Sequence, residues 1–135
     1  MKFLTKNTDY AVRAILGLAG NPTVFVSSRE IADKQKIPYQ FLRGILQVLI
    51  KNGFVESKEG AGGGVRILKD AAEIKIIDLI KLFQGEIELS ECMFRQKICE
   101  NRNTCVLRSE IKRIEEMVNK EFGDLTIQKL LEKLK

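Results

Sequence analysis

Three cysteines, Cys92, Cys99 and Cys105, fall within fourteen residues of the chain. Their spacing, Cys-x6-Cys-x5-Cys, is too wide for the Cys-x2-Cys knuckle of structural zinc and differs from the tight ferredoxin pattern. Thiolates are the ligands of iron-sulfur clusters, and nearby arginine and lysine side chains would stabilise their negative charge. The pattern therefore indicates an iron-sulfur cluster of the 2Fe-2S or 4Fe-4S type, with a metal-free thiol-disulfide switch or three unrelated thiols as alternatives.

Three thiolates leave a fourth cluster ligand unassigned, and the chain contains no histidine. Within the cysteine segment, Glu88, Glu91, Glu100 or an exogenous group are the candidates. The lack of histidine also removes Ser-His and Cys-His nucleophile pairs and the usual neutral general base. We therefore expect that the protein is not an enzyme. The less favoured alternative is an iron-sulfur electron carrier or enzyme.

The composition is that of a small globular protein with a basic balance. Its 135 residues carry a net charge of +5 and a pI near 9.2, which favours a polyanionic partner. No apolar run approaches the roughly 18 residues that a membrane span needs, and the first residues do not read as a signal peptide. We expect a cytoplasmic protein without a membrane partner.

The first predicted secondary-structure element is an amphipathic helix over residues 6–20. Ser27 is expected to cap a short second helix by accepting a hydrogen bond from the amide of Glu30. Pro38 suits the first turn of a third helix, and Gly53 is expected to end it in a left-handed conformation. The second and third helices together predict a helix-turn-helix.

Strands predicted at 54–58 and 65–68 flank a tip with four glycines in five residues, which is typical of a β wing. A fourth helix is expected at about 74–84. After the cysteine segment, a charged helix carries a narrow apolar stripe suited to pairing with a second copy, and a last amphipathic helix follows. The stripe consists of Leu107, Ile111, Ile114, Val118 and Phe122.

The predicted fold class is mainly α with a small β wing: a winged helix-turn-helix plus a long C-terminal dimerisation helix. We divide the chain into a DNA-binding domain (1–85), a cysteine cluster-binding loop (86–105), and the dimerisation and C-terminal helices (106–135).

Charge and residue types on these elements favour double-stranded DNA as the partner. Between Ser27 and Lys69, eight basic residues face four acidic ones, so this third of the chain carries most of the net charge. The first turns of a recognition helix can reach base edges, while flanking elements hold phosphates. The predicted DNA-binding residues are Ser28, Arg29, Tyr39, Gln40, Phe41, Arg43, Lys58 and Arg66. The alternative is an ordinary solvated surface with a tight hairpin.

Several short sequence motifs follow one another along nearly the whole chain. They are Asn7-Thr8-Asp9-Tyr10-Ala11-Val12-Arg13, Glu30-Ile31-Ala32, Phe41-Leu42, Gly53-Phe54-Val55, the glycine-tipped wing and the three late cysteines. Together they resemble the Rrf2 family of bacterial transcription regulators, which includes iron-sulfur regulators of the IscR and NsrR types. The resemblance implies a homodimeric regulator, most often a repressor, in which a long helix pairs the protomers.

The resemblance also implies that Cys92, Cys99 and Cys105 ligate the cluster. IscR-like members use a histidine three residues after the last cysteine, where this chain has Arg108. NsrR-like members use an aspartate of the partner chain's first helix, and Asp9 matches that position. Asp9 has the alternative of simply favouring the positive end of its own helix.

Two departures from the family pattern concern DNA binding. Family wings commonly carry arginine where this chain has Glu59, and several members have glutamate where it has Arg43. The resemblance thus implies an operator that differs from theirs, and sensing of redox state, nitric oxide, oxygen or iron supply. A cluster-free member that responds to cysteine oxidation, a small molecule or a protein partner is the alternative.

Overall fold

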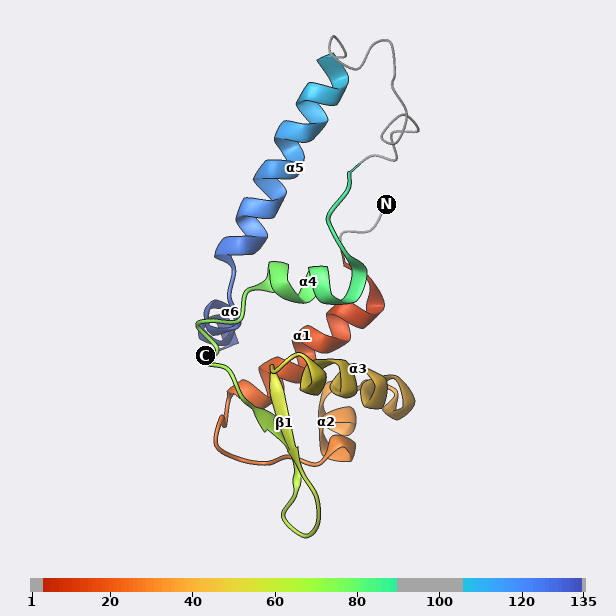
Figure 1. Ribbon diagram of the computed structural model, residues 1–135. Coiled ribbons are helices and arrows are strands. Elements are labelled where there is room, and N and C mark those ends of the chain that lie inside the picture. Colours follow the sequence, from red (N-terminus) through yellow and green to blue (C-terminus); the bar gives the residue numbers. More distant parts are fainter. Residues whose placement is uncertain (1–3, 90–105, 135) are drawn as a thin grey trace.

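The computed structural model describes residues 4–89 and 106–134 of the chain. In these ranges the chain forms helices and a two-stranded antiparallel sheet (Figure 1). The elements are α1 (Lys6–Ala19), α2 (Ser28–Gln35), α3 (Tyr39–Lys51), β1 (Val55–Lys58), β2 (Gly64–Ile67), α4 (Ile76–Gln84), α5 (Val106–Asp124) and α6 (Ile127–Leu134). The mainly helical architecture with a small wing confirms the predicted fold class.

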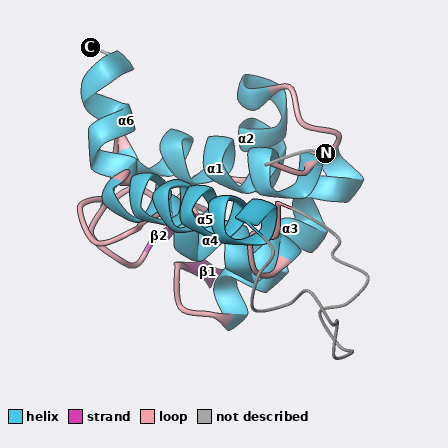
Figure 2. Cartoon of the chain, turned by 90° about the horizontal axis from the view of Figure 1, so that it is seen from above, coloured by secondary structure: helices cyan, strands magenta, loops and turns pink. Residues whose placement is uncertain are grey.

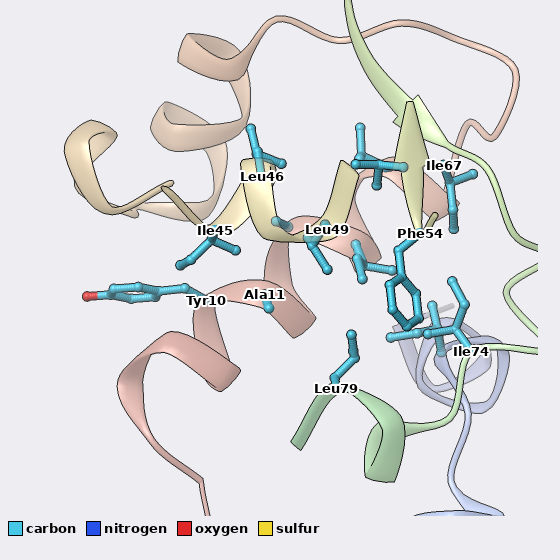
Figure 3. Packing of buried hydrophobic residues seen from close by; sticks show 14 of the residues in the cluster. Tyr10, Ala11, Ile45, Leu46, Leu49, Phe54, Ile67, Ile74 and Leu79 are labelled. Carbon is cyan, nitrogen blue, oxygen red and sulfur yellow. The ribbon is translucent and has the colours of Figure 1, made fainter. Parts of the chain in front are cut away.

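Helix α1 is the central element of the fold. Its apolar face is fully buried, and α1 packs against α2, α3, α4 and α6. Figure 3 shows Ala11 of α1 close to Leu49 of α3 and Leu79 of α4, all three fully buried. The small alanine side chain lets the neighbouring helices approach α1 closely, so one helix organises the core around it.

The helix-turn-helix follows the predicted local signals. Ser27 caps α2, and its Oγ accepts a hydrogen bond from the Glu30 amide at 3.2 Å. Lys36 ends this helix with a left-handed φ of 55°. Pro38 occupies the N-cap position of α3, one residue before the first turn in which the sequence placed it, and its carbonyl accepts from the Leu42 amide at 3.0 Å.

The end of α3 confirms the predicted role of Gly53, whose φ is 79°. The Gly53 amide donates to the Ile50 carbonyl at 3.2 Å, and the Phe54 amide donates to the Leu49 carbonyl at 2.9 Å. This pair of bonds is the Schellman arrangement, which satisfies carbonyls left free at a helix end. It turns the chain directly from α3 into β1.

The wing is attached to the helix-turn-helix through the segment before α2. In the sheet, Val55 lies opposite Ile67. Val26 forms a further antiparallel bridge with Val65, whose two N–H to O distances are both 2.8 Å. A Cβ atom at Gly64 would lie 2.3 Å from the Val26 carbonyl oxygen, so this close approach requires glycine.

Helix α5 runs away from the rest of the molecule above α4 (Figures 1 and 2). None of its residues is buried. Leu107, Ile114 and Met117 are 66%, 41% and 55% exposed, although they are large and apolar. Leu107 and Ile114 of the predicted stripe therefore face outward, whereas Val118 and Phe122 of the same stripe are partly buried against the core of their own chain.

Helix α6 turns back onto α1. Ile127 is fully buried, and its amide donates to the Ile74 carbonyl at 2.9 Å. The Ile76 amide donates to the Leu125 carbonyl at the same distance, which fixes the entry to α4 against the entry to α6.

The three-part division of the chain stays a prediction. Among the described helices, none has the length and apolar character to cross a lipid bilayer.

Candidate nucleic-acid interface

The first turns of α2 and α3 meet at Tyr39. Ser28 Oγ, at the start of α2, donates a hydrogen bond to the Tyr39 hydroxyl at 3.4 Å. The Arg29 guanidinium carbon lies 4.3 Å from the centre of the Tyr39 ring, which is a cation–π distance. Arg43, one turn further along α3, lies 6.0 Å from the same ring centre. Four predicted DNA-binding residues are therefore brought together; we call them the Tyr39 cluster.

The surroundings of Tyr39 change its acidity. The hydrogen bond from Ser28 is the main cause that lowers the pKa of the hydroxyl below its ordinary value of 10.0. Partial burial raises this pKa, and the charges of Arg29 and Arg43 lower it further. The two arginine charges, which are the smaller causes, make the local potential more positive, and this suits a surface that meets phosphate.

A second aromatic ring holds cations at the base of the wing. The Arg66 guanidinium carbon lies 4.5 Å from the centre of the Phe25 ring, and Lys58 Nζ lies 5.7 Å from it. Arg66 also forms an ion pair with Glu56 on the neighbouring strand. We call Phe25, Lys58 and Arg66 the Phe25 cluster.

The two clusters come from segments joined by few residues, since Phe25 precedes α2 by three positions. Figure 1 shows the wing beside α2 at one end of the molecule, with α5 projecting from the opposite end. Lys58 and Arg66 were predicted from the sequence as DNA-binding residues, whereas Phe25 was not. An aromatic residue next to the cap of α2 was the available signal.

Gln40 and Phe41 take a different position on α3. With Asn7 of α1 and Phe83 of α4 they line an open groove of about 240 Å³. Phe41 is 55% exposed, and its ring centre lies 6.5 Å from that of Tyr10 in α1. The predicted base-contacting residues of α3 are thus divided between the Tyr39 cluster and this groove.

Asp9 lies on the exposed side of α1, and its side chain is 54% exposed. Its carboxylate oxygen is 3.3 Å from Arg13 Nε. Arg13 in turn donates a hydrogen bond to the Gln35 carbonyl at 2.8 Å, where α2 ends. A carboxylate accessible from outside the protomer is thereby connected to the helix-turn-helix through one arginine.

The predicted cluster ligands Cys92, Cys99 and Cys105 lie outside the described residues. Within 4–89 and 106–134, no three acidic or other metal-ligating side chains gather in a group that could hold a metal ion. The part of the predicted ligand set that the structure describes is Asp9. Its carboxylate oxygen is exposed, so a group held by a second chain could reach it.

The family model for Rrf2, described as an iron-dependent transcriptional regulator, matches residues 4–133. The chain belongs to the Rrf2 family of transcription regulators. The predicted family is confirmed.

Relatives and solved structures agree with this membership. The chain is 37% identical over 105 residues to the transcriptional regulator NsrR of Shouchella clausii, covering 77% of this chain and 67% of that protein. It is 34% identical over 111 residues to the protein aau3 of Rhizobium meliloti, covering 82% and 72%. The structure is similar to IscR of T. potens (TM-score 0.79, 23% identity, covering 100% and 89%) and to CymR of B. subtilis, a global cysteine regulator (TM-score 0.80, 21% identity, covering 98% of both chains).

Proposed function

We propose that this Rrf2 regulator is a homodimeric, sequence-specific DNA-binding repressor that senses redox state, nitric oxide or iron-sulfur status through a cysteine-ligated iron-sulfur cluster. The observation that carries the DNA-binding part is the pair of cation–aromatic clusters on the helix-turn-helix and the wing. A transcription regulator works where the chromosome is, which places the protein in the bacterial cytoplasm.

The division of labour on DNA follows from the chemistry of each side chain. Arg43 suits a bidentate contact to guanine and Gln40 one to adenine, whereas Phe41 could pack on a thymine methyl. Ser28 and Arg29 at the start of α2, and Lys58 and Arg66 on the wing, suit phosphate oxygens. In this assignment α3 recognises the operator sequence, whereas α2 and the wing bind the DNA backbone.

Dimerisation is assigned to α5. The large apolar residues that α5 exposes, Leu107, Ile114 and Met117, would be unfavourable in water and favourable against a second copy. Two recognition helices related by two-fold symmetry would then read two half-sites about one helical turn apart. The partner of this protein is thus a second copy of the chain as well as a near-palindromic operator.

The cluster ligands are assigned to Cys92, Cys99 and Cys105, with Asp9 of the partner subunit as the fourth. Three thiolates and an accessible carboxylate form a suitable donor set for iron, and the family description as iron-dependent supports the assignment. When bound, an iron-sulfur cluster supplies a centre that reacts with oxidants or nitric oxide. A ligand from the partner subunit makes cluster binding depend on the arrangement of the two protomers.

The DNA-binding proposal is tested with the Arg43→Ala variant. We expect loss of preference for a duplex selected by the wild-type protein from a randomised pool, while affinity for a scrambled duplex of the same length is largely kept. Lys129→Ala is the matched control, since α6 and α3 lie on opposite sides of the molecule in both views (Figures 1 and 2). An unchanged preference in Arg43→Ala would remove this residue from base recognition.

The cluster proposal is tested by anaerobic purification with iron and sulfide counts per chain. We expect a brown wild-type protein, loss of iron in Cys99→Ser, and a weakened or spectrally altered cluster in Asp9→Asn. Asp78→Asn, which changes an exposed aspartate of α4, is the matched control and should keep the cluster. A colourless wild-type protein that still binds DNA would favour the cluster-free alternative, with regulation by cysteine oxidation or by another partner.

A further inference from the structure

The side chain of Tyr39 links the two helices of the helix-turn-helix and lies next to two arginines. It is the first residue of α3 and is half-buried. Its hydroxyl accepts from Ser28 of α2, and its ring lies 4.3 Å from the Arg29 guanidinium and 6.0 Å from that of Arg43. One aromatic ring therefore determines where a cation of α2 lies relative to a cation of α3.

Both guanidinium groups remain available to an external anion. Within the described residues, the ion pairs of the protein involve neither Arg29 nor Arg43. In the Phe25 cluster, by contrast, Arg66 is paired with Glu56. A guanidinium above a ring keeps the N–H groups of its edge free, and these are the groups that phosphate and guanine accept from.

We propose that Tyr39 is a positioning residue for operator recognition, which holds Arg29 for a phosphate and Arg43 for a guanine at a fixed spacing. The inference rests on the proposed DNA-binding function and adds a role within it. A free arginine loses much rotamer freedom when it binds, and a ring that already restricts the side chain reduces this loss. Tyr39 thus links the phosphate contact of Arg29, which does not depend on the DNA sequence, to the guanine contact of Arg43, which does.

The ring and the hydroxyl make separable contributions. Tyr39→Phe keeps the ring and removes only the hydrogen bond with Ser28, whereas Tyr39→Leu removes the ring as well. Because Tyr39→Leu abolishes two exposed cation–π interactions, we expect this variant to bind the selected duplex roughly 5- to 30-fold more weakly. Tyr39→Phe should retain most of the wild-type affinity.

The experiment compares these variants by fluorescence anisotropy on a duplex that the wild-type protein selects from a pool randomised over about 25 base pairs, which spans two half-sites. A scrambled duplex and a salt series accompany each titration. We expect Tyr39→Leu to lose more affinity for the selected duplex than for the scrambled one, and its salt dependence to become shallower by about 0.9 for each phosphate that it no longer binds. Its melting temperature should stay close to that of the wild type.

Two further variants show whether the effect is one of positioning. In an Arg43→Ala background, Tyr39→Leu should no longer change the preference at the guanine positions, because the side chain that it positions is absent. Phe25→Leu removes the other cation-holding ring and should weaken both duplexes equally without changing base preference.

The outcomes separate this inference from the function on which it rests. Salt-sensitive selection by the wild type, together with unchanged affinity and salt dependence in Tyr39→Leu, overturns the positioning role alone. Equal weakening on both duplexes by Tyr39→Leu, with a lowered melting temperature and no rescue in Tyr39→Phe, shows a structural role and also overturns it. A wild-type protein that selects no duplex and shows no salt-sensitive binding overturns both proposals.

Discussion

Gly64→Ala tests the attachment of the wing to the helix-turn-helix. The added Cβ would lie 2.3 Å from the Val26 carbonyl oxygen, 2.5 Å from its carbon and 2.8 Å from the Ser27 nitrogen. All three are backbone atoms, so rotation of a side chain cannot relieve the contact. The φ of 140° at Gly64 is a conformation that alanine rarely adopts. The substitution therefore forces the segment before α2 away from β2.

The cost follows from the bonds that this movement breaks. Ordinary van der Waals contact begins at 3.4 Å, so the segment must move by about 1 Å, which takes the two 2.8 Å bonds between Val26 and Val65 beyond hydrogen-bond range. Two bonds at about 1 kcal/mol each and backbone strain of about 1–2 kcal/mol lower the free energy of unfolding by about 3–4 kcal/mol. For a domain of this size the melting temperature should fall by roughly 10–15 °C.

Thermal unfolding followed by circular dichroism measures this effect, with Gly62→Ala as the matched control. Gly62 also has a positive φ, of 75°, but nothing lies within 4 Å of its added Cβ, so we expect a loss of only about 1 kcal/mol. A fall of less than about 3 °C in Gly64→Ala, which is under 1 kcal/mol, would refute the argument that the bridge joins wing and helix. At low temperature the folded variant should also show a shallower salt dependence of DNA binding, because the wing cations are displaced.

Three further predictions concern the helix-turn-helix. Gly44→Ala, inside α3 with open space around the added Cβ, should raise the free energy of unfolding by about 0.5–1 kcal/mol in chemical denaturation, and a destabilised variant would contradict the open space. Ser27→Ala should lower it by about 1 kcal/mol through loss of the α2 cap, whereas the exposed Ser57→Ala should change it little. Ser28→Ala should raise the pKa of Tyr39 toward 10.0 in an alkaline absorbance titration read against Tyr39→Phe. Because folding lowers this pKa, the contribution of Tyr39 to stability is present above its unfolded pKa and is lost as the pH falls through its folded pKa.

Local signals explain why much of the fold is predictable from the sequence. The Ser27 cap joins atoms three residues apart, and the turn at Gly53 joins atoms at most five residues apart. Such contacts depend on residue types that are next to each other in the chain. The strands flanking the glycine-rich tip follow in the same way, since the length of the tip fixes their register. The helix boundaries differ by about one or two residues, as at Pro38.

Contacts between distant residues explain what the sequence could not give. The place of Phe25 under the wing cations depends on the bridge between Val26 and Val65, which are far apart in the chain. The orientation of Phe41 toward Tyr10 depends on how α3 crosses α1. Composition and periodicity contain no information on either. The cluster assignment stays a prediction, because its three cysteines lie outside the described residues.

The contacts around α1 bear on how a signal at Asp9 could reach the DNA-binding surface. Arg13 binds both the Asp9 carboxylate and the Gln35 carbonyl, so α1 and the end of α2 are joined close to the turn that leads into α3. The bridge between Val26 and Val65 joins the start of α2 to the wing. The Tyr39 and Phe25 clusters are therefore joined to α1 by direct contacts and form one unit with it. In the proposed dimer, losing the proposed ligand bond at Asp9 of the partner subunit would reorient this unit as a whole, so both clusters would change their distance to the second half-site together. Regulation by this proposed route would act on half-site spacing and would need no rearrangement within the recognition helix.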